Sequence, residues 1–378
     1  MTVAPKLALH FKCKASLGAT MPIAPHPTLP IRIDYFYHTK TDYHKMKLII
    51  PMAGRGSRLR PHTLTVPKPV VPIAGKPIVE RLAETLTNYI DGTFEEIAFI
   101  IGDFGPEIEE QLLGIANKLG STGKIYYQEN PQGPAHAIHC AKDSIDGPCI
   151  VAFADTLFYG DFDLNTSADG LIWTKQVEDP SAYGVVLTDE NQMITGFEEK
   201  PTAFISDLAI VGIYYFKNGD RMKTELCRVI DEDMRYKGEF QITTVLENLN
   251  ESGYTFGSKR VDEWLDCGNK DALVHANKRV LDIEDHRSVY TDVTIEDSCI
   301  IQPCHIGSDV TIVNSVIGPH VSIGSGTRIE RSIIENSVIQ NSSEINHVNI
   351  KDSMIGNHTK YIGKTNNISI GDYSQLEA

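Results

Sequence analysis

The chain has 378 residues, enough to bury a large core and to form two domains. Its 50 acidic and 35 basic residues give a formal net charge of -15, so nucleic acid and anionic membranes are not expected partners. No stretch reaches the ~20 apolar residues that span a bilayer. The 7 cysteines form no Cys-x-x-Cys pair, which favours reduced thiols in the cytoplasm.

Residues 1–45 are expected to be an N-terminal extension that is either disordered or not native. The segment has no acidic residue before Asp34 and lacks the continuous apolar stretch of a signal peptide. A transit peptide is the alternative, although arginine is scarce. Met46 and Lys47 stand directly before the first predicted strand, so the folded protein is expected to begin at residue 46.

From residue 47 to about 160 the pattern alternates strands with helices. This predicts a Rossmann-like α/β domain whose mostly parallel sheet is covered on both faces. Strands are expected at 48–52, 97–101, 125–128 and 150–154, with helices at 78–88, 107–119 and 134–144. Ligands bind beyond the carboxyl ends of such strands, where Asp155 falls.

A more mixed region follows and is expected to complete the catalytic domain at about residue 285. Strands are expected at 170–177, 183–187, 193–197 and 210–216, with helices at 221–230, 242–250 and 270–280. An insertion of this kind in a nucleotide-binding domain is a natural place for a second substrate.

Residues 290–375 are rich in isoleucine and show almost no helix signal. Isoleucines recur every five or six residues from Ile306 to Ile355, often followed by glycine. These intervals match the hexapeptide repeat of a left-handed parallel β-helix of about five coils, with each isoleucine filling a corner. Because its ends need covering, we expect packing on the catalytic domain or on another subunit, and a homo-oligomer.

The segment from Lys47 to Pro77 combines a strand, a glycine turn and two cations. Gly54 and Gly56 allow the backbone to approach an anion closely. Arg58 and Lys68 add positive charge that could stabilise a polyphosphate. A Walker A loop would need Gly-Lys-Ser/Thr, and a dinucleotide fingerprint would need glycine where Leu59 stands.

The string from Gly54 to Leu59, followed by Pro67-Lys68-Pro69 and Lys76-Pro77, resembles the signature of sugar-1-phosphate nucleotidylyltransferases. The chain is most similar to the glucose-1-phosphate thymidylyltransferase and uridylyltransferase group. The resemblance covers residues 47 to about 280, and a β-helix tail also occurs among such enzymes.

This resemblance implies a nucleotide site at the glycine turn and a magnesium site beside it. The nucleotide contacts would include Ala53, Gly54, Gly56 and Ser57, and the catalytic residues would be Arg58, Lys68 and Asp155. Mg²⁺ would be bound by two carboxylates, those of Asp155 and Asp266, the latter in a Trp-x-Asp-x-Gly string. Cys267 stands where the family often has threonine.

Base recognition is expected from Gln128 and Gly133. The amide of Gln128 can pair with a pyrimidine imide edge by donating and accepting at once, and the glycine lets the backbone approach the base. Family members with this spacing use uridine or thymidine triphosphate, although Pro134 departs from the usual residue. His136 and His139 lie three apart without a third ligand and are expected to be structural.

Sugar-phosphate contacts are expected from the inserted region. Glu199-Lys200-Pro201 resembles the family's Glu-Lys-Pro, whose glutamate meets sugar hydroxyls and whose lysine meets the phosphate. Gly184, within Tyr-Gly-Val, and Gly212 would leave room for the sugar ring.

The expected reaction transfers a nucleotidyl group from dTTP or UTP to a sugar 1-phosphate, with glucose 1-phosphate favoured, and releases pyrophosphate. Three alternatives stay open: a mannose-1-phosphate guanylyltransferase-type enzyme, a non-catalytic nucleotide-sensing regulatory subunit, and a hexapeptide-repeat acyltransferase. The last would use a β-helix histidine as base; the four candidates, His305, His320, His347 and His358, are expected to be solvated corner residues instead.

Overall fold

A computed structural model describes residues 46–54, 56–90, 92–160, 162–284 and 292–364. The extension predicted at 1–45 lies outside these residues. Within them, no helix combines the length and the apolar composition that a membrane crossing needs.

The core of the first part is a 9-stranded mixed sheet with the central order β10-β9-β11-β6-β1-β4-β5. Its parallel half comprises β6 (Cys149–Ala152), β1 (Lys47–Pro51), β4 (Glu96–Ile101) and β5 (Thr122–Tyr127). The other half contains β8 (Gly170–Gln176), β9 (Gly184–Thr188), β10 (Ile194–Glu199), β11 (Leu208–Phe216) and β12 (Phe256–Arg260). β11 joins the two halves because it pairs antiparallel with β6 and β8. The predicted Rossmann-like mixed fold is confirmed.

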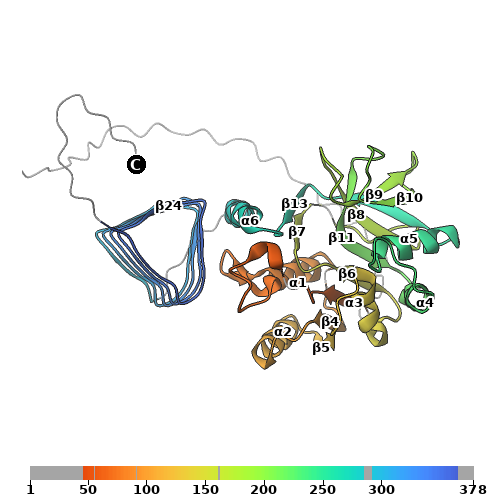
Figure 1. Cartoon of the computed structure of the whole chain (residues 1–378), viewed down its shortest axis with the longest axis horizontal. Helices are drawn as coiled ribbons and strands as arrows, with labels where there is room; N and C mark the ends of the chain where they lie inside the picture. Colours follow the sequence, from red (N-terminus) through yellow and green to blue (C-terminus); the bar gives the residue numbers. More distant parts are fainter. Residues whose placement is uncertain (1–45, 55, 91, 161, 285–291, 365–378) are drawn as a thin grey trace, which may run out of the picture. The chain divides into compact units, whose positions relative to one another are not determined.

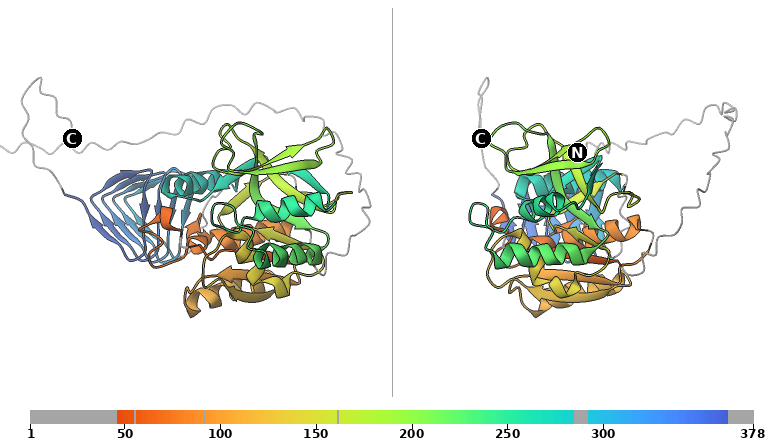
Figure 2. Two further views of the ribbon diagram at one scale, coloured as in Figure 1. Left: turned by 45° about the vertical axis from the view of Figure 1, so that its right-hand side comes forward. Right: turned by 90° about the vertical axis from the view of Figure 1, so that its right-hand side faces the viewer.

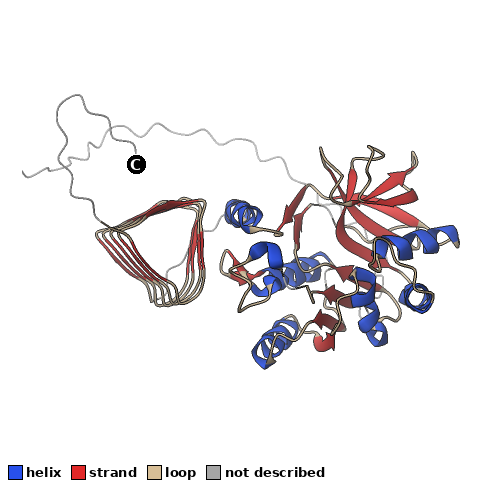
Figure 3. Cartoon of the chain, in the orientation of Figure 1, coloured by secondary structure: helices blue, strands red, loops and turns tan. Residues whose placement is uncertain are grey.

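Helices cover both faces of this sheet, as Figure 3 shows. Successive side chains of a strand point to opposite faces, so Leu48 and Ile50 of β1 join one hydrophobic cluster and Ile49 joins another. The first cluster includes α1 (Ile78–Tyr89), α2 (Pro106–Lys118) and α6 (Lys270–Ile283). The second includes α3 (Pro134–Cys140), α4 (Gly219–Asp231) and α5 (Ile242–Glu251).

Several elements differ from those expected. The helix predicted over 134–144 ends at Cys140 and is followed by a separate 3-10 helix at Lys142–Ser144. Two short strands were not predicted: β7 (Thr156–Tyr159) and β13 (Glu263–Asp266), which pair antiparallel with each other. β12 was also missed. Each is held by a partner far along the chain, so its own residues give no local signal.

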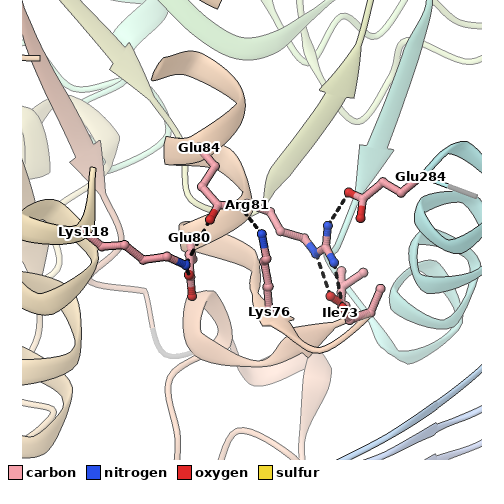
Figure 4. Close-up of polar contacts among 8 residues, drawn as sticks. Ile73, Lys76, Glu80, Arg81, Glu84, Lys118 and Glu284 are labelled. Carbon is pink, nitrogen blue, oxygen red and sulfur yellow. Dashed lines mark hydrogen bonds and ion pairs between the residues drawn. The ribbon is translucent and has the colours of Figure 1, made fainter. Parts of the chain in front are cut away.

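A small hairpin, β2 (Pro72–Ile73) with β3 (Lys76–Pro77), follows the catalytic-lysine candidate. Arg81 of α1 is buried against it and donates from Nε to the Ile73 carbonyl oxygen at 2.6 Å and from Nη2 to that of Ala74 at 2.8 Å. Its Nη1 also pairs with the Glu284 carboxylate at 2.5 Å. Figure 4 shows this arginine between the hairpin and the residue that follows α6.

Residues 294–362 form the predicted parallel β-helix, whose short strands run from β14 (Thr294–Glu296) to β26 (Lys360–Ile362) in three sheets. The intermediate strands are β15 (Cys299–Ile300), β16 (Cys304–Ile306), β17 (Thr311–Val313), β18 (Val316–Ile317), β19 (Val321–Ile323), β20 (Arg328–Glu330), β21 (Ile333–Glu335), β22 (Val338–Ile339), β23 (Glu344–Asn346), β24 (Asn349–Lys351) and β25 (Met354–Ile355). Figure 1 shows the triangular outline of the coils and Figure 2 shows how they stack.

The coils are shorter than three full hexapeptides. Thr294 pairs with Thr311 and Arg328 with Glu344, so the repeat is 311 − 294 = 17 residues in an early coil and 344 − 328 = 16 in a later one. The repeating isoleucines from Ile306 to Ile345 lie in the strands and are buried in the interior of the coils. Turns instead use left-handed polar residues such as Asp309 and His358, both with positive φ.

The first coils contact α6 and the β2–β3 hairpin. Asn277 of α6 is fully buried, and its Oδ1 accepts from the Ala74 amide at 3.0 Å and from the Ser322 hydroxyl at 2.6 Å. His320 Nε2 lies 2.8 Å from the Asp282 carboxylate. The expectation that the β-helix histidines are solvated is therefore wrong for His320.

Candidate active site

The turn after β1 requires glycine at one position. Gly56 has a φ of 60°, and a Cβ atom there would lie 2.8 Å from Cβ of Lys68. The Thr63 hydroxyl donates to the Gly56 carbonyl oxygen at 2.8 Å and holds the turn closed. A 3-10 helix at Ser57–Leu59 follows, and its Arg58 side chain is exposed at the carboxyl edge of the sheet.

Lys68 lies at the start of a 3-10 helix, Lys68–Val70, and is almost fully buried. Its Nζ donates to Oδ2 of Asp155 at 2.8 Å. Asp155 follows β6 in the turn that leads to β7, and its side chain is partly exposed. The structure thus joins two predicted catalytic residues in one ion pair at the mouth of the sheet.

Asp266 ends β13, and the pairing of β13 with β7 brings it beside Asp155. The two strands pair Asp266 with Thr156, and the Cys267 amide donates to the Asp155 carbonyl oxygen at 3.1 Å. Burial raises the pKa of Asp266, and the charge of Asp155 raises it further, while Lys68 and Arg58 act to lower it. Cys267 is fully buried and its pKa is raised by burial, as expected of a core residue.

Two neighbouring carboxylates that repel each other fit a magnesium ion. Mg²⁺ in proteins takes one or two carboxylates and completes its octahedron with water and substrate phosphates. Within the described ranges, no group of three or more His, Cys, Asp and Glu side chains could enclose a metal. Asp155 and Asp266 therefore suit an ion that is bound together with a polyphosphate.

Asp155 lines a pocket of about 440 Å³ at the carboxyl edge of the sheet, whereas Asp266 is not in its wall and only the neighbouring Gly268 is. Its wall contains every residue predicted to bind nucleotide or to catalyse: Ala53, Gly54, Gly56, Ser57, Arg58, Lys68, Gln128, Gly133 and Asp155. A second hollow, of about 770 Å³, shares Ala53, Gln128 and Pro131 with it and is also lined by Phe104 and Tyr127.

The predicted sugar-phosphate residues form a separate group. Glu199 pairs with Gly184 across β9 and β10, and a Cβ atom on this glycine would lie 3.0 Å from Oε2 of Glu199. The same carboxylate accepts from the Thr243 hydroxyl at 3.1 Å, and Lys200 Nζ is 3.9 Å from Glu199 Oε1. None of these residues is in the wall of the 440 Å³ pocket.

One hydrogen bond and one set of charge effects connect this group with the pocket and with Asp266. The Gly212 carbonyl oxygen accepts from the amide of Phe153, a pocket residue, at 3.0 Å. Tyr183 precedes Gly184, and the charges of Asp266 and Arg58 shift the pKa of its phenol in opposite directions, although burial is the main reason that this pKa is raised.

Sequence reasoning missed several pocket residues, among them Phe153, Glu239 and Gly268. Phe153 stands two residues before Asp155 and could have been inferred from that proximity. Gly268 is the glycine of the Trp-x-Asp-x-Gly string, and a Cβ atom there would lie 2.9 Å from Oδ1 of Asp266. Glu239 lies between α4 and α5 in a loop without a recognisable pattern, so only the fold brings it to the pocket.

Comparison with known proteins decides the family. The sequence model of the family described as nucleotidyl transferase matches residues 47–283. The chain belongs to this nucleotidyltransferase family. The match includes the glycine turn, Lys68, Asp155 and Asp266, so the predicted resemblance and the predicted enzyme class are confirmed.

Similarity to relatives of this nucleotidyltransferase covers most of the chain. A protein named glucose-1-phosphate thymidylyltransferase from Streptomyces antibioticus is 30% identical over 362 residues, which cover 88% of this chain and 99% of that protein. The low-salt glycan biosynthesis nucleotidyltransferase Agl11 of Haloferax volcanii is also 30% identical, over 88% of this chain and 100% of its own length.

A solved structure supports the same fold. The crystal structure titled as a putative glucose-1-phosphate thymidylyltransferase from Bacillus anthracis, in complex with a sucrose, superimposes with a TM-score of 0.52 at 25% identity. The alignment covers 61% of this chain and 94% of that one.

Proposed function

We propose that this nucleotidyltransferase transfers a nucleotidyl group from dTTP or UTP to a sugar 1-phosphate, with glucose 1-phosphate the favoured acceptor. The observation that carries the proposal is the single pocket in which the glycine turn, Arg58, the Lys68–Asp155 pair and Gln128 meet. The relatives named as glucose-1-phosphate thymidylyltransferases support the choice of sugar.

In the proposed reaction, a phosphate oxygen of the sugar phosphate attacks the α-phosphorus of the triphosphate in line. The new phosphorus–oxygen bond forms as the bond to the β-phosphate oxygen breaks, and pyrophosphate leaves with that electron pair. No covalent enzyme intermediate is needed. The protein contributes positioning of the two substrates and stabilisation of the charge that moves to pyrophosphate.

Arg58, Lys68 and Mg²⁺ would each stabilise a different part of the phosphate charge. Arg58, exposed on its 3-10 helix, is suited to the β- and γ-phosphates because its planar fork binds two oxygens at once. Lys68 is buried beside Asp155 and can bridge the phosphates of both substrates. Mg²⁺ would be held by Asp155 and Asp266 and would neutralise charge on the triphosphate.

Nucleotide and sugar would bind on different sides of these charges. The backbone of Ala53, Gly54, Gly56 and Ser57 would contact the nucleotide, with Gln128 and Gly133 at the base. Gly184, Glu199, Lys200 and Gly212 would hold the sugar phosphate, across Tyr183 from Asp266. The cytoplasmic location and the homo-oligomer expected from the sequence remain part of this proposal; sedimentation of the purified chain tests the second.

A pyrophosphate-release assay tests the function directly. The full chain is mixed with Mg²⁺ and each combination of dTTP, UTP, GTP, CTP and ATP with glucose, mannose and N-acetylglucosamine 1-phosphates. We expect release with dTTP or UTP and glucose 1-phosphate. Release only with GTP and mannose 1-phosphate would replace the assigned substrates, and no release with any pair would overturn the proposal.

A further inference from the structure

The amide nitrogen of Gln128 has both of its hydrogens engaged inside the protein. Nε2 donates to the Gly133 carbonyl oxygen at 3.1 Å and contacts Nδ1 of His136 at 2.9 Å. Because a carbonyl oxygen can only accept, the contact with Gly133 identifies this atom of Gln128 as the nitrogen. Gln128 is 6% exposed and lines the pocket, so only its Oε1 remains to meet a ligand.

His136 must therefore accept at Nδ1. A neutral imidazole accepts at one nitrogen and carries its hydrogen on the other. The second nitrogen, Nε2, then carries the hydrogen and lies 3.3 Å from the amide nitrogen of Gln132, which is longer than the 2.9 Å contact at Nδ1 and forms no hydrogen bond, because both atoms are donors. Burial lowers the pKa of His136, and the charge of Arg235 lowers it further, which keeps the ring neutral at pH 7.

The surroundings hold this arrangement in place. Arg235 donates from Nη2 to Oε1 of Gln132 at 2.7 Å, which fixes the orientation of that amide. Arg235 also lies over the ring of Phe240, with its guanidinium carbon 4.0 Å from the ring centroid. The imidazole of His136 stacks on the same ring at a centroid distance of 6.4 Å. Neither the ring nor the Gln132 amide can turn over without losing one of these contacts.

We propose that His136 is a positioning residue that orients the Gln128 amide so that only its oxygen faces the nucleotide base. This inference rests on the proposed function, in which Gln128 meets the base. An acceptor alone pairs with a base that donates N–H from its ring edge, as uracil and thymine do at N3 and guanine does at N1. At the equivalent positions, N3 of cytosine and N1 of adenine carry a lone pair instead of a hydrogen. Each would face the lone pairs of Gln128 Oε1 and be repelled.

The arrangement revises the pairing expected from the sequence, in which Gln128 would donate and accept at once. It also gives His136 a role that the spacing of His136 and His139 did not suggest. The pocket selects bases that can donate a hydrogen bond to Oε1 of Gln128. Discrimination of this kind is strong, because a wrong base leaves a buried polar group unpaired.

Binding of UTP and CTP to the full chain, measured by isothermal titration calorimetry with Mg²⁺ and without sugar phosphate, tests the inference. The wild type should bind UTP about tenfold to a hundredfold more tightly than CTP. In His136→Leu the amide is free to rotate and to offer N–H to the base, so the ratio should fall toward one. His136→Asn keeps an acceptor oxygen near the position of Nδ1 and should restore the ratio.

Gln132→Ala is the matched control, since it removes the amide on the other side of the same ring while leaving Nδ1 in place. Its UTP to CTP ratio should equal that of the wild type. An unchanged ratio in His136→Leu, or an equal loss in Gln132→Ala, would overturn the inference. Wild-type protein that binds UTP and CTP equally would overturn it and leave the proposed function standing, whereas binding of no nucleotide would overturn both.

A second measurement is independent of nucleotide and decides the matter if His136→Leu fails to fold. In wild-type protein with ¹⁵N-labelled histidine, the signals absent from His136→Asn belong to this ring. We expect Nε2 to be protonated and Nδ1 to be unprotonated at pH 7.5. A hydrogen on Nδ1 would contradict the assigned orientation of Gln128.

Discussion

At the scale of single residues, the site is organised around the contact between Lys68 and Asp155. The lysine is 6% exposed, so its ammonium group has exchanged water for one carboxylate oxygen at 2.8 Å. In a complex with substrates and a divalent ion, phosphate oxygens would accept hydrogen bonds from Lys68, and the carboxylate of Asp155 would bind the ion. The pair holds both groups in position before the substrates arrive.

Replacing this lysine tests its role in catalysis. Lys68→Ala removes the cation expected to bridge the phosphates, so turnover should fall about a hundredfold to a thousandfold in the pyrophosphate-release assay. Lys76→Ala is the control, because Lys76 is half-exposed and pairs with Glu84 outside the pocket. Equal turnover in the two variants would rule out the role assigned to Lys68.

Acid should weaken both base selection and folding through His136. Burial lowers the pKa of His136 from its ordinary value of 6.5, and the charge of Arg235 lowers it further. The folded state is therefore protonated at a lower pH than the unfolded state. Stability is then complete above about pH 6.5 and is lost as the pH falls below it. The pKa values of His139 and His62 are lowered as well, both mainly by burial.

The protonated ring would also donate from Nδ1 and displace the amide nitrogen of Gln128. We expect the UTP to CTP affinity ratio and the urea midpoint of unfolding to stay level between pH 8 and 7 and to decrease together between about pH 6.5 and 5.5. In His136→Asn the ratio should stay level throughout. A wild-type ratio that is independent of pH down to 5.5 would argue against a neutral acceptor at this position.

At the scale of elements, the β2–β3 hairpin links Lys68 to the rest of the fold. The 3-10 helix that begins at Lys68 runs directly into β2, and Arg81 holds the carbonyl oxygens of Ile73 and Ala74 (Figure 4). Bonds from a buried guanidinium to carbonyl oxygens are among the stronger hydrogen bonds in proteins. The hairpin is thus held by α1 rather than by its own two residues per strand.

Arg81→Ala should lower the free energy of unfolding by about 2–3 kcal/mol, because two buried carbonyl oxygens lose charged donors. Lys118→Ala is the comparison, since Lys118 is exposed and pairs with Glu80 and Glu84 on the neighbouring surface. That variant should cost less than about 1 kcal/mol. Thermal unfolding followed by circular dichroism measures the stability of both variants. A larger loss of stability in Lys118→Ala than in Arg81→Ala would contradict the role assigned to Arg81 in holding the hairpin.

Element prediction succeeded where the pattern is local. The strands β1 and β4 and the helices α1 and α2 lie within one or two residues of their predicted ranges, because their apolar periodicity is set by their own sequence. β7 and β13 were missed because each is short and stable only through the other. The helix at Pro134 was predicted too long, since residues 142–144 continue the pattern but not the α-helical backbone.

At the scale of the whole molecule, one asparagine connects three segments. Asn277 of α6 accepts from Ala74 in the hairpin and from Ser322 in the β-helix, and its Nδ2 lies 3.4 Å from the His320 carbonyl oxygen. Asn277 thus links the hairpin that follows Lys68 to the β-helix. We therefore expect the β-helix to stabilise this hairpin.

Asn277→Ala should leave the Ala74 amide and the Ser322 hydroxyl buried without an acceptor, at a cost of about 2–3 kcal/mol in unfolding free energy. Turnover should also fall, but by less than in Lys68→Ala, because the lysine itself remains. Asn336→Ala provides the control: its Nδ2 donates to Asp352 at 2.6 Å on the exposed surface of the β-helix. Normal stability and turnover in Asn277→Ala would show that the β-helix does not support the hairpin.

Features that depend on short spacing could be predicted from the amino-acid sequence: the glycine turn with its cations, the strand–helix alternation, and the isoleucine repeat that specifies stacked coils. Which distant groups meet could be seen only in the folded chain. Asp266 reaches Asp155 because β13 pairs with β7, and the Gln128 amide is oriented by His136 and Gly133. The physical reason is that a side chain's chemistry belongs to its residue type, whereas its charge and hydrogen-bond direction depend on the partners that the fold places beside it.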